Sequence, residues 1–179
     1  MNRLLLLPFV FLTTIAAAQQ KIDFETYNPS STLVVPQHPI TRAKFPFIDV
    51  HNHQFQMGSM DLNTLTVEMD KLNMKVMVNL SGGSGAQLQK MIENARTNKP
   101  GRFIVFANID FKGVGEPGWG ERAAKQLDDD VKNGANGLKI YKSLGFSVKD
   151  INGNRVTVDD ERLDPIWKKA GELKIPVLI

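Results

Sequence analysis

Five short apolar runs alternate with stretches of helical periodicity, and this alternation constrains the fold more than any other feature of the chain. The runs lie at residues 47–53, 75–80, 103–110, 137–141 and 175–179. Consecutive runs begin 28 to 38 residues apart, which leaves room for one strand and one helix in each unit. So regular an alternation predicts a parallel sheet of right-handed crossover units that is covered on the outside by helices.

Four helices are predicted between these runs from the spacing of apolar residues and from capping residues. They span residues 61–72, 86–97, 121–133 and 164–173. Asp61 is a typical N-cap, and Pro165 suits the first turn of a helix. The dipeptide Asn152-Gly153 lies between two short apolar segments, 146–148 and 155–158, and predicts a hairpin turn before the last helix.

The fold class expected is α/β. A complete (β/α)8 barrel needs about 250 residues, and this chain of 179 residues stops inside its fifth apolar run. We therefore expect residues 47–179 to form a partial TIM barrel of about five β/α units, preceded by an extended arm at 19–46. A small five-stranded open sheet is the alternative.

Residues 1–18 are typical of a secretory signal peptide. Asn2 and Arg3 form a short positive start, residues 4–15 are almost entirely apolar, and Ala16-Ala17-Ala18 supplies small residues for cleavage. The apolar run is shorter than the roughly 20 residues that span a membrane comfortably. The mature protein is expected to be periplasmic or secreted and free of the membrane, with a retained membrane anchor as the alternative.

Charge and composition exclude several classes of function. The formal net charge is only +3, and Lys and Arg are scattered among Asp and Glu instead of forming a basic stripe, so no nucleic-acid partner is expected. The chain has no cysteine, which excludes disulfide bonds and thiol catalysis. The oligomeric state is left open by the sequence.

The strongest chemical signal is the segment Phe47–His53, read as Phe-Ile-Asp-Val-His-Asn-His. Residues two apart on a strand share a face, so the rings of His51 and His53 are expected side by side at the strand exit, where they can bind one cation. Asp49 lies on the same face and is expected to hold a ring N–H in the second shell. The alternative is a polar strand end with two solvated histidines.

Each of the next three strands also has one face that becomes polar near its carboxyl end, where barrels of this type place their active sites. If this polar face points to the barrel axis, the site is lined by Asp49, His51, His53, Asn79, Ser81, Asn108, Asp110, Lys139 and Tyr141. A lysine in an apolar strand needs a partner or a role, so Lys139 is expected to pair with an aspartate, bind an anionic substrate or carry a carbamate. For Asn79, Ser81 and Asp110, a loop-capping role is the alternative.

Several segments resemble a known group of enzymes. Phe47-Ile-Asp-Val-His-Asn-His53 resembles the first-strand signature of the amidohydrolase superfamily, most of all the amidohydrolase-related branch that includes the aminocarboxymuconate-semialdehyde decarboxylase-like enzymes. Gly137–Tyr141 and the segments 163–167 and 175–179 also look like that branch. The resemblance covers residues 45–179.

This resemblance implies a metal-dependent barrel that usually holds zinc or another divalent ion. His51 and His53 match the first two metal ligands of the family. Its other ligands, two histidines after the fifth and sixth strands and an aspartate after the eighth, would follow Ile179. Lys139 falls on the fourth strand, where some members of the superfamily carry a carbamylated lysine.

The function expected is hydrolysis of an amide, ester or lactone in a small-molecule substrate by a metal-activated water. Lys139 and Tyr141 are expected to orient the substrate, and a carboxylate to act as the general base. The alternatives are a decarboxylase on the same barrel, a phosphoesterase of the polymerase-and-histidinol-phosphatase type, and a non-catalytic exported domain with a structural metal. Since catalytic zinc usually has three protein ligands, the 179 residues by themselves are expected to bind metal weakly and to be inactive.

Overall fold

The computed structural model describes residues 23–36 and 38–179, and the chain divides into two units between Pro39 and Ile40. The described part of the first unit has a turn at 24–26 and otherwise irregular backbone. The expected signal peptide, residues 1–18, lies outside the described residues. Within the described ranges, no helix has both the length and the apolar character needed to cross a bilayer.

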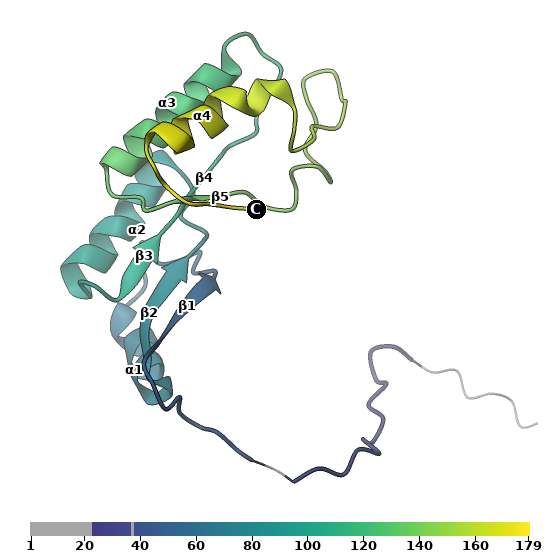
Figure 1. Ribbon diagram of the computed structural model, residues 1–179, viewed down its shortest axis with the longest axis vertical. Coiled ribbons are helices and arrows are strands. Elements are labelled where there is room, and N and C mark those ends of the chain that lie inside the picture. The colour runs from purple at the N-terminus through teal and green to yellow at the C-terminus, as the bar shows by residue number, and fades with distance from the viewer. Residues whose placement is uncertain (1–22, 37) are drawn as a thin grey trace, which may run out of the picture. The chain divides into compact units, whose positions relative to one another are not determined.

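The second unit is a mixed α/β fold, as predicted (Figure 1). Its strands are β1 (Phe47–Asn52), β2 (Met74–Asn79), β3 (Phe103–Val105), β4 (Ala107–Asn108), β5 (Leu138–Lys139) and β6 (Val177–Leu178). Its helices are α1 (Leu62–Leu72), α2 (Gly85–Asn98), α3 (Trp119–Lys132), α4 (Asp164–Glu172) and a short 3-10 helix, η1 (Glu161–Leu163). The strands form two parallel sheets, in the orders β1-β2-β3 and β4-β5-β6.

The helix predictions are confirmed to within two residues at each end. Asp61 caps α1 by accepting a hydrogen bond from the backbone N–H of Asn63 at 2.9 Å, and the helix ends at Asn73 in the left-handed conformation, with φ 66°. Residues 40–46 of the predicted arm belong to the second unit. The N–H of Ala43 donates to the carbonyl of Leu72 at 3.1 Å, which ties this segment to the end of α1.

The third predicted strand, 103–110, is divided into β3 and β4, so the expected single sheet is replaced by two. The partners of this run are offset along it: β2 ends opposite Val105, and β5 begins opposite Ala107. Phe106 stands at the junction, and its N–H still donates to Asn79 O at 3.0 Å. No residue of the run is therefore paired in both sheets, although the strands follow one another in chain order.

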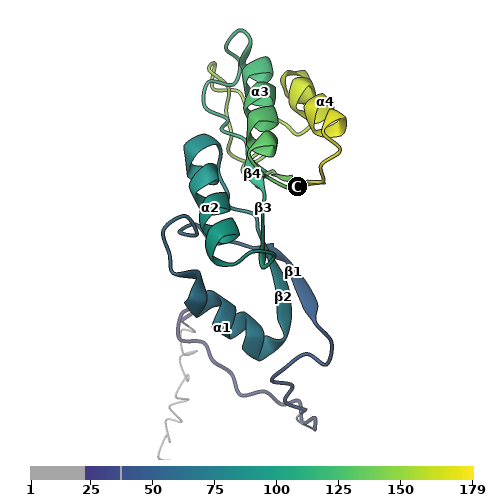
Figure 2. The same cartoon turned by 90° about the vertical axis from the view of Figure 1, so that its left-hand side faces the viewer.

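The two faces of the strands carry cores of unequal size. Figure 2 shows α1 and α2 on the same side of β2 and β3, and α3 packs beside α4. The larger core lies between strands and helices and includes Leu88, Met91, Leu127, Leu138, Ile140 and Ile166. The opposite face, called here the inner face, carries a small cluster of Val78, Leu80 and Phe106, with Ile104 and Leu178 packed against it. A Cβ on Gly137 would lie 2.5 Å from the Phe106 ring, so any larger residue there would force this ring to shift.

The predicted hairpin turn is confirmed, but the segments on either side of it form a single bridge and no strands. Gly153 has a φ of 82°, and one antiparallel bridge joins Lys149 to Arg155. The guanidinium of Arg162 donates to Asp150 at 2.9 Å and to Asp160 at 2.6 Å, and it lowers the pKa of both carboxyl groups. This ion pair fastens the hairpin to the start of α4.

Candidate functional site

His51 and His53 stand at the carboxyl end of β1, and their rings are neighbours, as predicted. The ring centroids lie 5.2 Å apart in an edge-to-face arrangement, with an interplanar angle of 70°. Both side chains are exposed, so their ring nitrogens are accessible to solvent. The pairing of β1 with β2 is irregular between Asp49 and Asn52, which places this pair where the strand leaves the sheet.

His53 is held by a chain of hydrogen bonds and by stacking. Its Nδ1 lies 2.8 Å from Ser81 Oγ, Ser81 Oγ lies 2.7 Å from the Tyr141 hydroxyl, and that hydroxyl lies 3.2 Å from Leu80 O. The imidazole stacks on Tyr141, at 5.8 Å between centroids, and on Phe55, at 6.0 Å. Partial desolvation, His51 and Lys139 all lower the pKa of His53, which favours the neutral ring.

Lys139 and Tyr141 come from β5 and the residues after it. Leu138 and Ile140 are buried in the large core, and the alternation places Lys139 and Tyr141 on the opposite side, as predicted. Lys139 is 7% exposed, and no described residue makes a hydrogen bond or ion pair with its ammonium group. Its charge is close enough to affect the pKa of His53. The structure therefore brings His51, His53, Ser81, Lys139 and Tyr141 together, and we call these five residues the imidazole cluster.

Asp49 does not contact either imidazole in the way the sequence suggested. Its Oδ1 accepts the backbone N–H of His51 at 3.0 Å, and its Oδ2 accepts from Asn52 Nδ2 at 2.8 Å. A short carboxylate side chain readily accepts from the backbone two residues ahead, and that local bond takes the place of a ring contact. The side chain that hydrogen-bonds to the ring of His53 is Ser81 instead.

Asn79 was predicted to line the barrel axis, and this is wrong. It is fully buried and faces the helices, with Nδ2 3.5 Å from the sulfur of Met57 and 3.7 Å from that of Met91. Its Oδ1 accepts the N–H groups of Gln54 at 2.9 Å and Ser81 at 3.0 Å, and its Nδ2 donates to Gln54 O at 3.1 Å. Asn79 thus fixes the loop after β1 and the exit of β2, because Val78 and Leu80 occupy the inner face.

Asn108 and Asp110 likewise make no hydrogen bond with the imidazole of His51 or His53. Asn108 Oδ1 accepts from Gly83 N at 2.7 Å, and its Nδ2 donates to the carbonyls of Leu80 at 3.0 Å and Lys139 at 3.1 Å. Its side chain therefore joins three strand exits. Asp110 is exposed, and its Oδ1 accepts the N–H of Lys112 at 2.9 Å. The structure thus gives both residues local structural contacts, and their predicted role in lining a substrate site stays a prediction.

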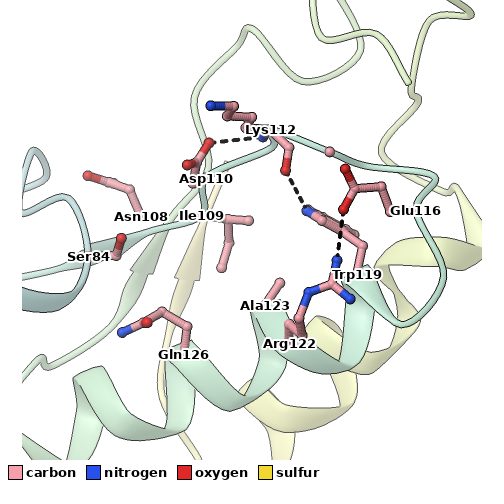
Figure 3. Close-up of a pocket in the computed structure, with 11 residues that line it drawn as sticks. Ser84, Asn108, Ile109, Asp110, Lys112, Glu116, Trp119, Arg122, Ala123 and Gln126 are labelled. Carbon is pink, nitrogen blue, oxygen red and sulfur yellow. Dashed lines mark hydrogen bonds and ion pairs between the residues drawn. The ribbon is translucent and has the colours of Figure 1, made fainter. Parts of the chain in front are cut away.

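A cavity of about 360 Å³, which sequence reasoning missed, lies between the loop after β4 and the first turns of α3 (Figure 3). Its lining mixes polar and apolar side chains, and it includes Ser84, Asn108, Ile109, Asp110, Glu116, Trp119 and Arg122. Trp119 Nε1 donates to Lys112 O at 3.1 Å, and Arg122 pairs with Glu116 at 3.1 Å. These polar groups therefore bond to the backbone or to each other.

Asp130 belongs to the acidic run Asp128-Asp129-Asp130 of α3, but it does not lie on a solvated face of that helix. Asp130 is buried, and its Oδ1 accepts from the N–H of Gly85 at 2.8 Å and from Gln126 Nε2 at 3.0 Å. Its Oδ2 has no partner among the described residues, and burial raises its pKa. The carboxyl caps the start of α2, where Ser84 makes no side-chain cap.

Two residues of the imidazole cluster, His51 and His53, have ring nitrogens suited to be two ligands of a divalent ion. The Nδ1 atom of His53 is engaged by Ser81, so its Nε2 atom is the one left to bind, and His51 stands beside it. Over residues 23–36 and 38–179, no group of three or more His, Cys, Asp or Glu side chains is placed to hold a metal ion. Within these ranges, His51 and His53 are therefore a pair of donors, one fewer than the three protein ligands usual at catalytic zinc.

No protein-family model matches this chain, and no curated protein is found to be similar to it.

Proposed function

We propose that this protein is a metal-dependent hydrolase of the amidohydrolase type, in which His51 and His53 are the first two ligands of a divalent ion, zinc being expected. The observation that carries the proposal is the pair of adjacent, accessible imidazoles at the carboxyl end of a parallel strand, with one ring held through Ser81. Imidazole nitrogens are among the preferred ligands of zinc.

We also propose that the fold is part of a (β/α)8 barrel. Two facts support this: the strands are parallel and follow one another in chain order, and the imidazole cluster lies at their carboxyl ends. Export is proposed from residues 1–18 of the sequence alone.

The chemistry proposed assigns separate roles to the residues of the cluster. When bound, a divalent ion lowers the pKa of a water molecule and polarises a carbonyl group. The ammonium of Lys139 and the hydroxyl of Tyr141 would orient the substrate beside the histidines. Asp49 is not assigned as the general base, because both its oxygens accept local hydrogen bonds.

Decarboxylation is a second candidate, and Lys139 is the observation that favours it. Lys139 as a residue is largely buried, but its ammonium is not fully enclosed and has no partner among the described residues, so it is open to pair with an anionic substrate group beside His53. Every substrate of a decarboxylase carries a carboxylate, whereas many esters, lactones and amides do not. The two reactions therefore differ in how strongly they should depend on Lys139.

Metal binding is tested by titrating the purified chain with Co²⁺ and Zn²⁺, following the Co²⁺ absorption spectrum and measuring heat. The sequence has three histidines, so His38, an exposed residue of the first unit, provides a matched control. Affinity should fall at least tenfold in His51→Ala and in His53→Ala, vanish in the double variant, and stay unchanged in His38→Ala. Equal binding by the double variant and the wild type would overturn the proposed site.

Activity is tested on the full gene product loaded with metal. Esters, lactones and amides report hydrolysis, β-keto and aromatic carboxylic acids report decarboxylation through released carbon dioxide, and simple phosphoesters report the phosphoesterase alternative. The hydrolase proposal expects turnover in the first group that disappears in the His51→Ala/His53→Ala variant. Turnover confined to the second or third group would replace the hydrolase with the corresponding alternative.

A further inference from the structure

The hydrogen-bond chain that begins at His53 ends at a group that can only accept. It runs from His53 Nδ1 to Ser81 Oγ at 2.8 Å, on to the Tyr141 hydroxyl at 2.7 Å, and then to the carbonyl oxygen of Leu80 at 3.2 Å. Each hydroxyl in this chain has one proton to donate, whereas a carbonyl has none. The fixed end therefore determines the direction of the other bonds.

The protons can be followed back from Leu80. The Tyr141 hydroxyl donates its proton to Leu80 O, so it accepts in its contact with Ser81. Ser81 then donates its only proton to Tyr141, so it accepts in its contact with His53. The group that donates to Ser81 is the Nδ1–H of the imidazole. In the reverse direction, the Tyr141 and Leu80 oxygens would face each other without a proton between them.

We propose that Ser81 and Tyr141 are positioning residues that hold the imidazole of His53 as its Nδ1–H tautomer and so leave Nε2 as a free lone-pair donor. This assignment concerns the protein without metal and does not rest on the proposed function. Its use in metal binding does rest on it, because only a nitrogen without a proton can act as a ligand.

The surroundings of the chain keep its members in place. Ser81 is buried, and its own N–H donates to Asn79 Oδ1 at 3.0 Å, so the backbone that carries its hydroxyl is held in place. The imidazole stacks on the ring of Phe55 and on that of Tyr141. His51, in contrast, makes no ring hydrogen bond with any described residue, so it serves as an internal reference of the same kind.

The tautomer is read directly by long-range ¹H–¹⁵N correlation spectra of protein labelled with ¹⁵N-histidine, recorded without metal at a pH above the titration of the imidazoles. Single His38→Ala and His51→Ala variants assign the three rings. His53 should show a protonated Nδ1 and an unprotonated Nε2, whereas His38 and His51 should show averaged signals. A His53 ring that carries its proton mainly on Nε2 would overturn the proposal without any variant.

Variants then distinguish the effect of the hydroxyl groups from that of ring packing. Tyr141→Phe keeps the stacked ring and removes the hydroxyl, and Ser81→Ala removes the central link, so in both the His53 signals should move toward those of His51. Tyr27→Phe, at the other tyrosine of the sequence, should change nothing, and Ser81→Thr, which keeps the hydroxyl, should retain the wild-type pattern. Unchanged His53 signals in both Tyr141→Phe and Ser81→Ala would contradict the proposed roles.

Zinc titrations of the same variants distinguish this inference from the proposed function. Loss of a group that orients a ligating histidine typically weakens metal binding about 10- to 100-fold, and Tyr141→Phe and Ser81→Ala should show that loss. If the tautomer behaves as proposed but wild-type protein binds no zinc, the metal site is wrong and the positioning role stands. If zinc binds at His51 and His53 but both variants bind it equally well, the positioning role is wrong.

Discussion

Asn79 and Lys139 are two largely buried polar residues on strands of the same unit, and they differ in whether their polar atoms have hydrogen-bond partners. Asn79 faces the helices, and both its side-chain polar atoms have hydrogen-bond partners. Lys139 faces the other way, and its ammonium has no partner among the described residues. The polar atoms of Asn79 are therefore completed within the fold, whereas the ammonium of Lys139 is left to solvent or to a ligand. Burial alone therefore does not mark a functional residue.

The largest effect on folding is expected from Asn79→Ala. The substitution leaves the buried N–H groups of Gln54 and Ser81 without their acceptor, which should lower the unfolding free energy by about 2–4 kcal/mol. Urea denaturation measures this, with Asn98→Ala, at an exposed helix end, as the control within about 0.5 kcal/mol of wild type. Equal effects of the two variants would contradict the structural role given to Asn79.

Asp130 lies between the two cases, because one oxygen has two partners and the other has none. Its pKa is raised in the folded protein, so the folded state binds this proton more tightly than the unfolded state does. The unfolding free energy of wild type should therefore fall, relative to Asp130→Asn, as the pH rises from the ordinary carboxyl pKa through the raised one. Urea denaturation across this window measures the difference, and a constant or rising difference would contradict the assignment.

The smallest effect on folding is expected from Lys139→Met, which keeps the buried stem and removes the charge. The unfolding free energy should stay the same or rise by up to about 1 kcal/mol, because an unpaired ammonium group is removed. Under the proposed function, turnover of carboxylate-bearing substrates by the metal-loaded protein should fall at least tenfold. Lys142→Met, at an exposed neighbour, is the control for both measurements. A loss of stability as large as that of Asn79→Ala would show that Lys139 has a structural partner.

Apolar spacing and capping residues were enough to predict the helices, but not which face of β2 points inward. In that strand Val76, Met77 and Val78 are apolar at both parities, because both faces are covered, so alternation cannot identify the inner one. The polar Asn79 was therefore assigned to the wrong face. On β5 the contrast of Leu138 and Ile140 with Lys139 and Tyr141 is clear, and Leu138 and Ile140 do lie in the large core.

Two other differences have their own physical reasons. Asp130 lies three residues after Leu127, on the apolar stripe of α3, and that spacing was the signal that could have revealed its burial. The division of 103–110 into β3 and β4 depends on where β2 ends and β5 begins, and that offset is a property of distant segments. The partner of the His53 ring depends likewise on a residue 28 positions away.

Asn108 has a mechanical consequence. A single carboxamide binds the turn at Gly83, the exit of β2 at Leu80 and the backbone of Lys139, and it also forms part of the cavity wall beside α3. Spreading these segments apart would break several hydrogen bonds at once. Asn108 thus holds the strand end that leads to Ser81 at a fixed spacing from Lys139. A molecule bound in the neighbouring cavity would contact the same side chain.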